Sequence, residues 1–292
     1  MIFENNSEGI MFIIIHKKRL NETTTLMRFD APAVARKARP GQFIILRIDE
    51  NGERIPLTIA DYDRENGTVG IIFQKVGATT RRLDLLEEGD SILDFVGPLG
   101  RESEFGDVAG KRVAVIGGGL GIAIAYPQAK ALHALGAKVD MIVGFRNIGL
   151  AILLDELKDV CEDLIVMTDD GSNGNKGFVT TALQDRIDSG VKYEHVVAIG
   201  PLPMMRAVCE ITRPYAIKTV VSMNPIMIDG TGMCGGCRLT VGGETKFACV
   251  DGPDFDGHLV DFDEAMKRSS MYRDFEQHAR EASCNLLAKE VK

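Results

Sequence analysis

Three cysteines in the last quarter of the chain have the spacing of metal ligands. They follow one another as Cys234-x2-Cys237-x11-Cys249. Plant-type [2Fe–2S] sites use C-x4-C-x2-C and a distant fourth cysteine, and the position of the first cysteine in that pattern holds Asp229. A carboxylate oxygen can also bind iron. The pattern therefore predicts a [2Fe–2S] cluster held by these three cysteines and Asp229.

Two other interpretations of the same residues stay open. Three thiolates and a carboxylate would also suit tetrahedral zinc, and Asp229 could instead cap a turn while the fourth ligand lies elsewhere. The glycines around the cysteines favour the cluster, because glycine amides can approach and bond its sulfides. They are Gly230, Gly232, Gly235, Gly236, Gly242 and Gly243. The remaining cysteines are scattered and are interpreted as small buried apolar residues.

A second group of residues has the pattern of a nucleotide site. The run Gly117-Gly118-Gly119-Leu120-Gly121 follows the apolar stretch Arg112–Ile116 and precedes a helical stretch, Ile122–Leu135. Glycines let backbone amides approach a pyrophosphate, and the helix N-terminus attracts its charge. Ile122 replaces the last glycine of the G-x-G-x-x-G fingerprint. The strand–loop–helix context still predicts nucleotide binding.

A later loop is expected at the same crevice. Gly200-Pro201-Leu202-Pro203-Met204-Met205 follows another strand-like run, His195–Ile199. Ligands of open α/β sheets bind beyond the carboxyl ends of the strands. Arg146, after the second strand of this region, could meet a 2′-phosphate.

A third pattern lies in the first hundred residues. Arg54-Ile55-Pro56-Leu57-Thr58 is followed by Gly77-Ala78-Thr79-Thr80. An arginine can hold a pyrophosphate through its forked donors, and Thr58 could donate to a flavin ring atom. Taken singly, these residues are more typical of an exposed basic strand residue and a Gly–Thr turn than of a flavin site, and only the whole pattern favours the flavin.

The elements that must position these residues form three segments. Residues 1–105 contain short β-like runs separated by turn signals, which predicts an antiparallel barrel. Residues 106–221 alternate β and α, which predicts a parallel sheet with helices on both faces. Residues 222–292 are expected to form a small Gly-rich lobe and a final helix, Phe262–Leu287. The predicted barrel strands are Met11–His16, Thr25–Phe29, Gln42–Ile48, Thr68–Lys75 and Ser91–Val96.

Composition and charge exclude several classes of function. The 292 residues are 45% hydrophobic and 26% charged, and the net charge of −8 disfavours nucleic acid and anionic membranes. No apolar run reaches the roughly 18 residues of a membrane helix, and Ile10–Ile15 is interpreted as a first strand rather than a signal peptide. A cytoplasmic location is expected. The acidic stretches Asp251–Asp256 and Phe262-Asp263-Glu264 are interpreted as solvated surface.

Together and in this order, the motifs resemble those of the ferredoxin reductase superfamily over nearly the whole length. Within it the chain resembles the electron-transfer subunit of dihydroorotate dehydrogenase. It resembles more closely the small (alpha) subunit of NADH-dependent reduced ferredoxin:NADP oxidoreductase, a sulfide dehydrogenase-like group. The motifs are Pro40-Gly41-Gln42-Phe43, Arg54-x-Pro56-Leu57-Thr58, Gly77-x-Thr79-Thr80, Gly117–Ala123, Gly200-Pro201 with Met204-Met205, and Met227–Cys237.

The resemblance implies a cofactor set and a partner. Arg54, Pro56, Leu57 and Thr58 would contact FAD, with Thr58 nearest the reacting flavin, and Gly77, Thr79 and Thr80 would lie near its phosphates. Gly118, Gly119, Gly200, Pro201, Met204 and Met205 would hold NAD(H). The dihydroorotate-type subunit has cysteine at the position of Asp229, so this departure favours the ferredoxin:NADP branch.

The same resemblance implies a larger flavoprotein partner with its own FAD and [4Fe–4S] clusters. Two alternatives from other classes are a stand-alone NAD(P)H reductase and a non-catalytic module with structural zinc.

Overall fold

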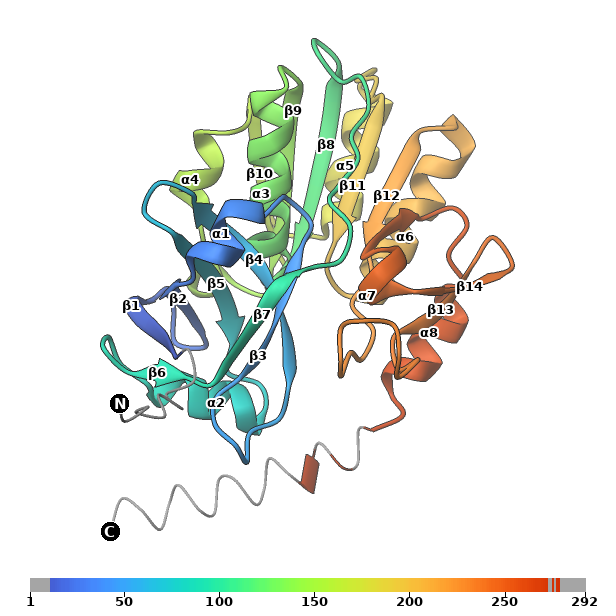
Figure 1. Cartoon of the computed structure of the whole chain (residues 1–292). Helices are drawn as coiled ribbons and strands as arrows, with labels where there is room; N and C mark the ends of the chain where they lie inside the picture. The colour runs from blue at the N-terminus through green and yellow to red at the C-terminus, as the bar shows by residue number, and fades with distance from the viewer. Residues whose placement is uncertain (1–10, 273–274, 276, 279–292) are drawn as a thin grey trace, which may run out of the picture.

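The first part of the chain is a nearly closed antiparallel barrel (Figure 1). The structure is a computed structural model that describes residues 11–272, 275, 277 and 278. Seven strands follow the order β6-β1-β2-β5-β4-β3-β7. They are β1 (Phe12–Arg19), β2 (Thr24–Asp30), β3 (Phe43–Arg47), β4 (Ile55–Asp63), β5 (Thr68–Gln74), β6 (Ser91–Ile92) and β7 (Asp94–Leu99). Two helices, α1 (Pro32–Lys37) and α2 (Ala78–Leu85), accompany the strands.

The second part contains a sheet with five parallel strands in the order β10-β9-β8-β11-β12. Its strands are β8 (Arg112–Gly118), β9 (Lys138–Phe145), β10 (Asp163–Thr168), β11 (His195–Ile199) and β12 (Lys218–Ser222). The helices between them are α3 (Gly121–Ala134), α4 (Leu154–Lys158), α5 (Val179–Asp188) and α6 (Leu202–Thr212), with 3-10 turns at Ile148–Leu150 and Arg213–Tyr215. Helix α3 also contacts β4, so it faces the barrel.

The C-terminal part packs against both of the others. It contains the hairpin β13 (Arg238–Val241) and β14 (Glu244–Phe247), then α7 (Ala248–Asp251), β15 (Asp254–Asp256) and α8 (Phe262–Ser269). Strand β15 pairs antiparallel with β12 and thereby extends the second sheet. The domain boundaries at residues 105 and 221 stay a prediction. Strand β15 lies beyond the second boundary in sequence but belongs to the sheet of the second part.

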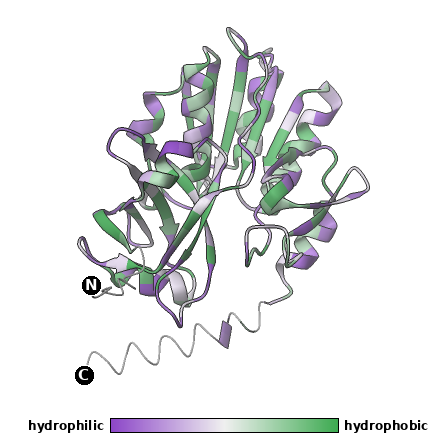
Figure 2. Cartoon of the chain, viewed as in Figure 1, coloured by the Kyte–Doolittle hydropathy of each residue, from purple (hydrophilic) through white to green (hydrophobic). Residues whose placement is uncertain are grey.

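Apolar side chains form three cores that match these parts. One fills the barrel, one lies between the second sheet and α3, and one joins α5 and α6 to the C-terminal part. Figure 2 shows the apolar colour concentrated in the strands of both sheets. The third core includes Phe43 and Ile45 of β3, so the outer face of that strand is covered by the C-terminal part.

The predicted fold class is confirmed, with local differences. Helix α4 is short, because Leu153 is left-handed (φ 59°) and the helix begins only after it. The predicted Gly–Thr turn at Gly77 begins a helix, α2. Helix α8 ends at Ser269, and most of the predicted helix beyond it lies outside the described residues. Among the described residues, the helices are all too short or too polar to cross a membrane.

Candidate functional site

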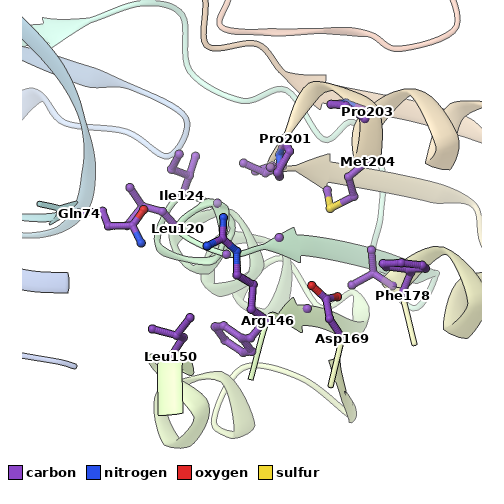
Figure 3. Close-up of a pocket in the computed structure, with 18 of the residues that line it drawn as sticks. Gln74, Leu120, Ile124, Arg146, Leu150, Asp169, Phe178, Pro201, Pro203 and Met204 are labelled. Carbon is purple, nitrogen blue, oxygen red and sulfur yellow. The ribbon is translucent and has the colours of Figure 1, made fainter. Parts of the chain in front are cut away.

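A cavity of about 870 Å³ lies where the parallel strands end and the barrel begins (Figure 3). Its floor is the glycine run after β8, and its walls include barrel residues Thr23, Gln74 and Val76. The later loop, which follows β11, also reaches it. Of the predicted nucleotide contacts, the lining includes Gly118, Gly119, Gly200, Pro201 and Met204.

The two loops are packed too closely for side chains at the glycines. A Cβ on Gly118 would lie 2.5 Å from the Met204 sulfur, and one on Gly121 would lie 2.3 Å from the Ile199 carbonyl oxygen. Gly119 has φ +56°, a conformation that L side chains rarely adopt. The glycine run therefore brings bare backbone to the cavity at the N-terminus of α3, which is the arrangement that binds a pyrophosphate.

Met205 does not share this position. Its side chain is fully buried in the core between α6 and the sheet. Adjacent helix residues point about 100° apart, so Met204 faces the cavity and Met205 faces inward. The predicted contact of Met205 with the nucleotide is therefore corrected to a packing role.

Several cavity residues were missed from the sequence, among them two that lie at the ends of elements of the second sheet. Asp169 follows β10, and Phe178 precedes α5; both line the cavity beside Arg146, as Figure 3 shows. The strand-end rule that selected the two glycine loops applies equally to the end of β10 and could have found Asp169.

The predicted flavin motif lies on β4, whose two faces have different surroundings. Ile55 and Leu57 pack against the barrel core. Side chains alternate along a strand, so Arg54, Pro56 and Thr58 share the outer face. Leu57 can therefore offer a ligand on this face only its backbone, whereas Arg54 and Thr58 can offer side chains.

The two barrel motifs meet in space. The Thr79 hydroxyl donates to the Glu53 carboxylate at 2.6 Å, which places the start of α2 beside Arg54. The Thr80 hydroxyl accepts from the Gly77 amide at 3.0 Å and orders the first turn of α2. Arg54 is half exposed, and its guanidinium lies 3.3 Å from Asp94. A guanidinium and a helix N-terminus at one place form a site suited to a pyrophosphate.

The cysteine loop lies on the same outer face of the barrel. Gly230 packs so closely that an added Cβ would lie 2.7 Å from Leu99 and 3.0 Å from Ile45. Ile45 pairs with Pro56 across the β3–β4 ladder, and Phe43 pairs with Thr58. The loop that follows Asp229 therefore contacts the strand next to the flavin motif.

The predicted metal ligands fall into two pairs. Cys237 and Cys249 are buried, with their sulfurs 3.2 Å apart. Burial and the neighbouring Cys237 raise the pKa of Cys249 to about 12. At the exposed end of the loop, the Asp229 carboxylate accepts from the Cys234 amide at 2.7 Å and from the Thr231 amide at 2.9 Å. Hydrogen bonds, led by the one from Thr231, lower the pKa of Asp229.

This donor set suits a two-iron cluster. Buried thiols are hard to ionise alone, but a bound metal deprotonates them. Two pairs of ligands match two irons, whereas zinc needs four donors around one point. In the described part of the chain, no three His, Cys, Asp or Glu side chains are grouped to hold one metal ion. The glycines allow a tight wrap: Gly230, Gly232 and Gly235 have positive φ, and the Gly236 amide lies 3.4 Å from the Cys234 sulfur.

Comparisons with known proteins agree with this geometry. Residues 224–261 match the iron–sulfur cluster binding domain of dihydroorotate dehydrogenase B. A dihydroorotate dehydrogenase B (NAD⁺) electron transfer subunit homolog from Thermotoga maritima is 46% identical, over 90% of this chain and 92% of that protein. The chain belongs to the dihydroorotate dehydrogenase B electron-transfer subunit family. An uncharacterised Clostridium beijerinckii protein from the adh 3′ region is 50% identical, over 92% of this chain and 93% of that protein.

A solved structure shares the whole fold of this family member. It is a chain of the NADH-dependent reduced ferredoxin-NADP oxidoreductase, whose structure was used to study flavin-based electron bifurcation. The match has a TM-score of 0.87 and 43% identity, over 94% of this chain and 99% of that chain. These findings confirm the predicted family, the ferredoxin reductase-like fold and the oxidoreductase class. They agree with a cofactor set of FAD, NAD(H) and an iron–sulfur cluster.

Proposed function

We propose that this chain is the electron-transfer subunit of an NADH-dependent ferredoxin:NADP oxidoreductase. NAD(H) would bind in the cavity at the glycine loops, FAD on the outer face of the barrel, and a [2Fe–2S] cluster at Asp229, Cys234, Cys237 and Cys249. The chain would pass electrons between these three sites and a partner.

The observation that carries the proposal is the position of β4. At one end of its outer face, Ala60 packs with α3, whose N-terminus carries the nucleotide loop. Towards the other end, Pro56 pairs with Ile45, against which Gly230 of the cysteine loop is packed. Thr58 lies between them. A flavin bound at Thr58 would therefore have the nucleotide site on one side and the cysteine loop on the other.

The protein contributes binding and orientation. Arg54 and the N-terminus of α2 would hold the FAD pyrophosphate, and the Thr58 hydroxyl would orient the flavin ring. Gly118 and Gly119 would bring the nicotinamide nucleotide against it, with Pro201 and Met204 as the opposite wall. When bound, FAD supplies the chemistry that joins two-electron exchange with a nicotinamide to one-electron exchange with iron.

The proposed partner is a larger flavoprotein with its own FAD and [4Fe–4S] clusters, and the proposed location is the cytoplasm. Asp229 supports the ferredoxin:NADP branch, because the resemblance implies a cysteine at that position in the dihydroorotate-type subunit.

A spectrum of the purified chain tests the proposal directly. We expect flavin absorption together with broad iron–sulfur absorption, and about two irons and two sulfides per chain. Anaerobic NADH should bleach both. A colourless protein that contains zinc would instead support the non-catalytic module with structural zinc. A flavoprotein without iron would overturn the assigned cluster.

Replacing Arg54 with alanine is expected to weaken FAD binding. The change removes a charge-assisted contact worth about 1–3 kcal/mol, which is roughly a 5- to 150-fold rise in the dissociation constant. Titration of the apoprotein with FAD, followed by flavin fluorescence, measures this rise. Arg39→Ala is the matched control, since Arg39 is another exposed arginine of the barrel, 3.5 Å from Glu102. Wild-type FAD affinity in Arg54→Ala would refute the assigned pyrophosphate position.

A further inference from the structure

A carboxylate behind the cysteine loop joins three parts of the chain. Asp254 lies on β15, in a stretch that the sequence analysis interpreted as solvated surface. That interpretation is wrong for Asp254, because its carboxyl group is turned inward and burial raises its pKa. The physical reason is a set of local contacts: Asp254 lies opposite Ser222 of β12 and within hydrogen-bond distance of Ser103 and Gln128, whereas Asp256, two residues on, is exposed.

Each donor to Asp254 comes from a different element. The Ser103 hydroxyl, after β7, donates at 2.6 Å, and the Gln128 side-chain amide, on α3, donates at 3.1 Å. Ser222, at the end of β12, lies opposite Asp254 in the β12–β15 ladder. Ser103 is itself fixed to the barrel, since its amide donates to the Pro40 carbonyl at 2.9 Å. Asp254 thus links the barrel, the helix that begins at the nucleotide loop, and the C-terminal part.

The same joint continues towards the cysteine loop. The Arg101 amide donates to the Gly252 carbonyl at 2.7 Å, and the Arg101 guanidinium donates to the Val250 carbonyl at 3.2 Å. Residues 101–103 therefore donate three hydrogen bonds to residues 250–254. That segment directly follows Cys249, which carries one of the two buried sulfurs.

Polar contacts at this joint lie beside the apolar core that β3 shares with the C-terminal part. A cavity of about 190 Å³, lined by Ser103, Gln128 and Asp254, adjoins it. Gln128 is fully buried, and within the described ranges its carbonyl oxygen has no hydrogen-bond partner. Burying a polar group costs free energy unless the group is hydrogen-bonded. Hydrogen bonds also fix the relative orientation of the groups they join, which apolar contacts do not. The joint is therefore better suited to setting a geometry than to adding stability.

We propose that Asp254 is a positioning residue for electron transfer between the flavin and the cluster. It fixes residues 250–254 against the barrel segment 101–103 and against α3, and so sets the distance from Cys249 to the outer face of the barrel. This inference rests on the proposed function, because it needs both cofactors in this chain.

Asp254→Asn is the test. The amide has nearly the same shape but carries no charge and has one acceptor oxygen fewer, so the hydrogen bonds from Ser103 and Gln128 are weakened. We expect amides 248–256 to exchange hydrogen faster, while the FAD content, iron content and KM for NADH stay unchanged. In stopped flow, flavin reduction by NADH should be unchanged and cluster reduction should slow at least about ten-fold, since ångström-scale displacements have effects of this size.

Asp256→Asn is the matched control, an exposed aspartate of the same strand. If Asp254→Asn does not fold, the same measurements are made on Ser103→Ala, which removes only one of the donors to Asp254. Native exchange or a native rate of cluster reduction in the variant would overturn the positioning role. Failure of the proposed function is distinguishable, because wild-type protein would then lack the cluster or show no NADH-driven cluster reduction.

Discussion

Asp229→Ala is expected to lose its iron–sulfur cluster and to keep its FAD. The substitution removes the only oxygen donor of the proposed ligand set, leaving three cysteines for two irons. Changes in the outer shell alone lower metal affinity about 10–100-fold, so loss of a direct ligand should exceed that range. Iron and sulfide assays, the visible spectrum and the paramagnetic signal on reduction measure the loss, while flavin absorption reports the retained FAD.

Two further substitutions separate metal binding from loop structure. The Asp229 carboxylate accepts from the Thr231 and Cys234 amides, so alanine would also disturb the loop. Asp229→Asn keeps an acceptor for those amides but removes the anionic ligand, and it should lose the cluster as well. Asp229→Cys completes the C-x4-C-x2-C spacing and should keep a cluster with an altered spectrum. Unchanged iron content and an unchanged paramagnetic signal in Asp229→Ala would remove Asp229 from the ligand set.

The nucleotide loops could be predicted because local sequence determines them. The apolar run of β8, the glycines after it and the apolar start of α3 all indicate one strand–loop–helix unit, which the structure contains. The meeting of the first and later glycine loops followed from a general property of parallel sheets. The distinction between Met204 and Met205 did not, because it depends on where α6 begins and on what each of its faces contacts.

Strand β4 and strand β15 were harder to predict because tertiary contacts determine them. Arg54 directly precedes β4, and Pro56 interrupts the apolar pattern of the strand. The reason is that the outer face of β4 does not pack against the barrel core. In β15, two aspartates flank Phe255, a pattern that by itself is typical of a surface turn. Asp254 is turned inward by its contacts with Ser103 and Gln128, and no local pattern encodes these donors, because they lie far from it in sequence.

The lone chain is expected to oxidise NADH with artificial dyes but not to couple that oxidation to NADP⁺ or ferredoxin. Its described residues offer one large cavity at the nucleotide loops and one flavin motif on β4. The cysteines outside the proposed cluster, Cys161, Cys209 and Cys284, are scattered along the sequence and have no cluster spacing. Reduction of ferredoxin would need further low-potential one-electron carriers, which the proposed function assigns to the partner flavoprotein.

The location of the cysteine loop agrees with a role at one end of a longer path. Cys234 is exposed, and the neighbouring Met233 is 89% exposed, so electrons reaching the cluster would be close to the protein surface. The assay compares dye reduction, NADP⁺ reduction and ferredoxin reduction by the homogeneous chain, with its native mass measured in parallel. Arg54→Ala is the internal control, since lowered FAD occupancy should decrease dye reduction in proportion. Efficient ferredoxin- and NADP⁺-coupled turnover by the chain alone would contradict the subunit assignment. The chain would then be a stand-alone reductase, because these 292 residues would hold every electron carrier that the reaction needs.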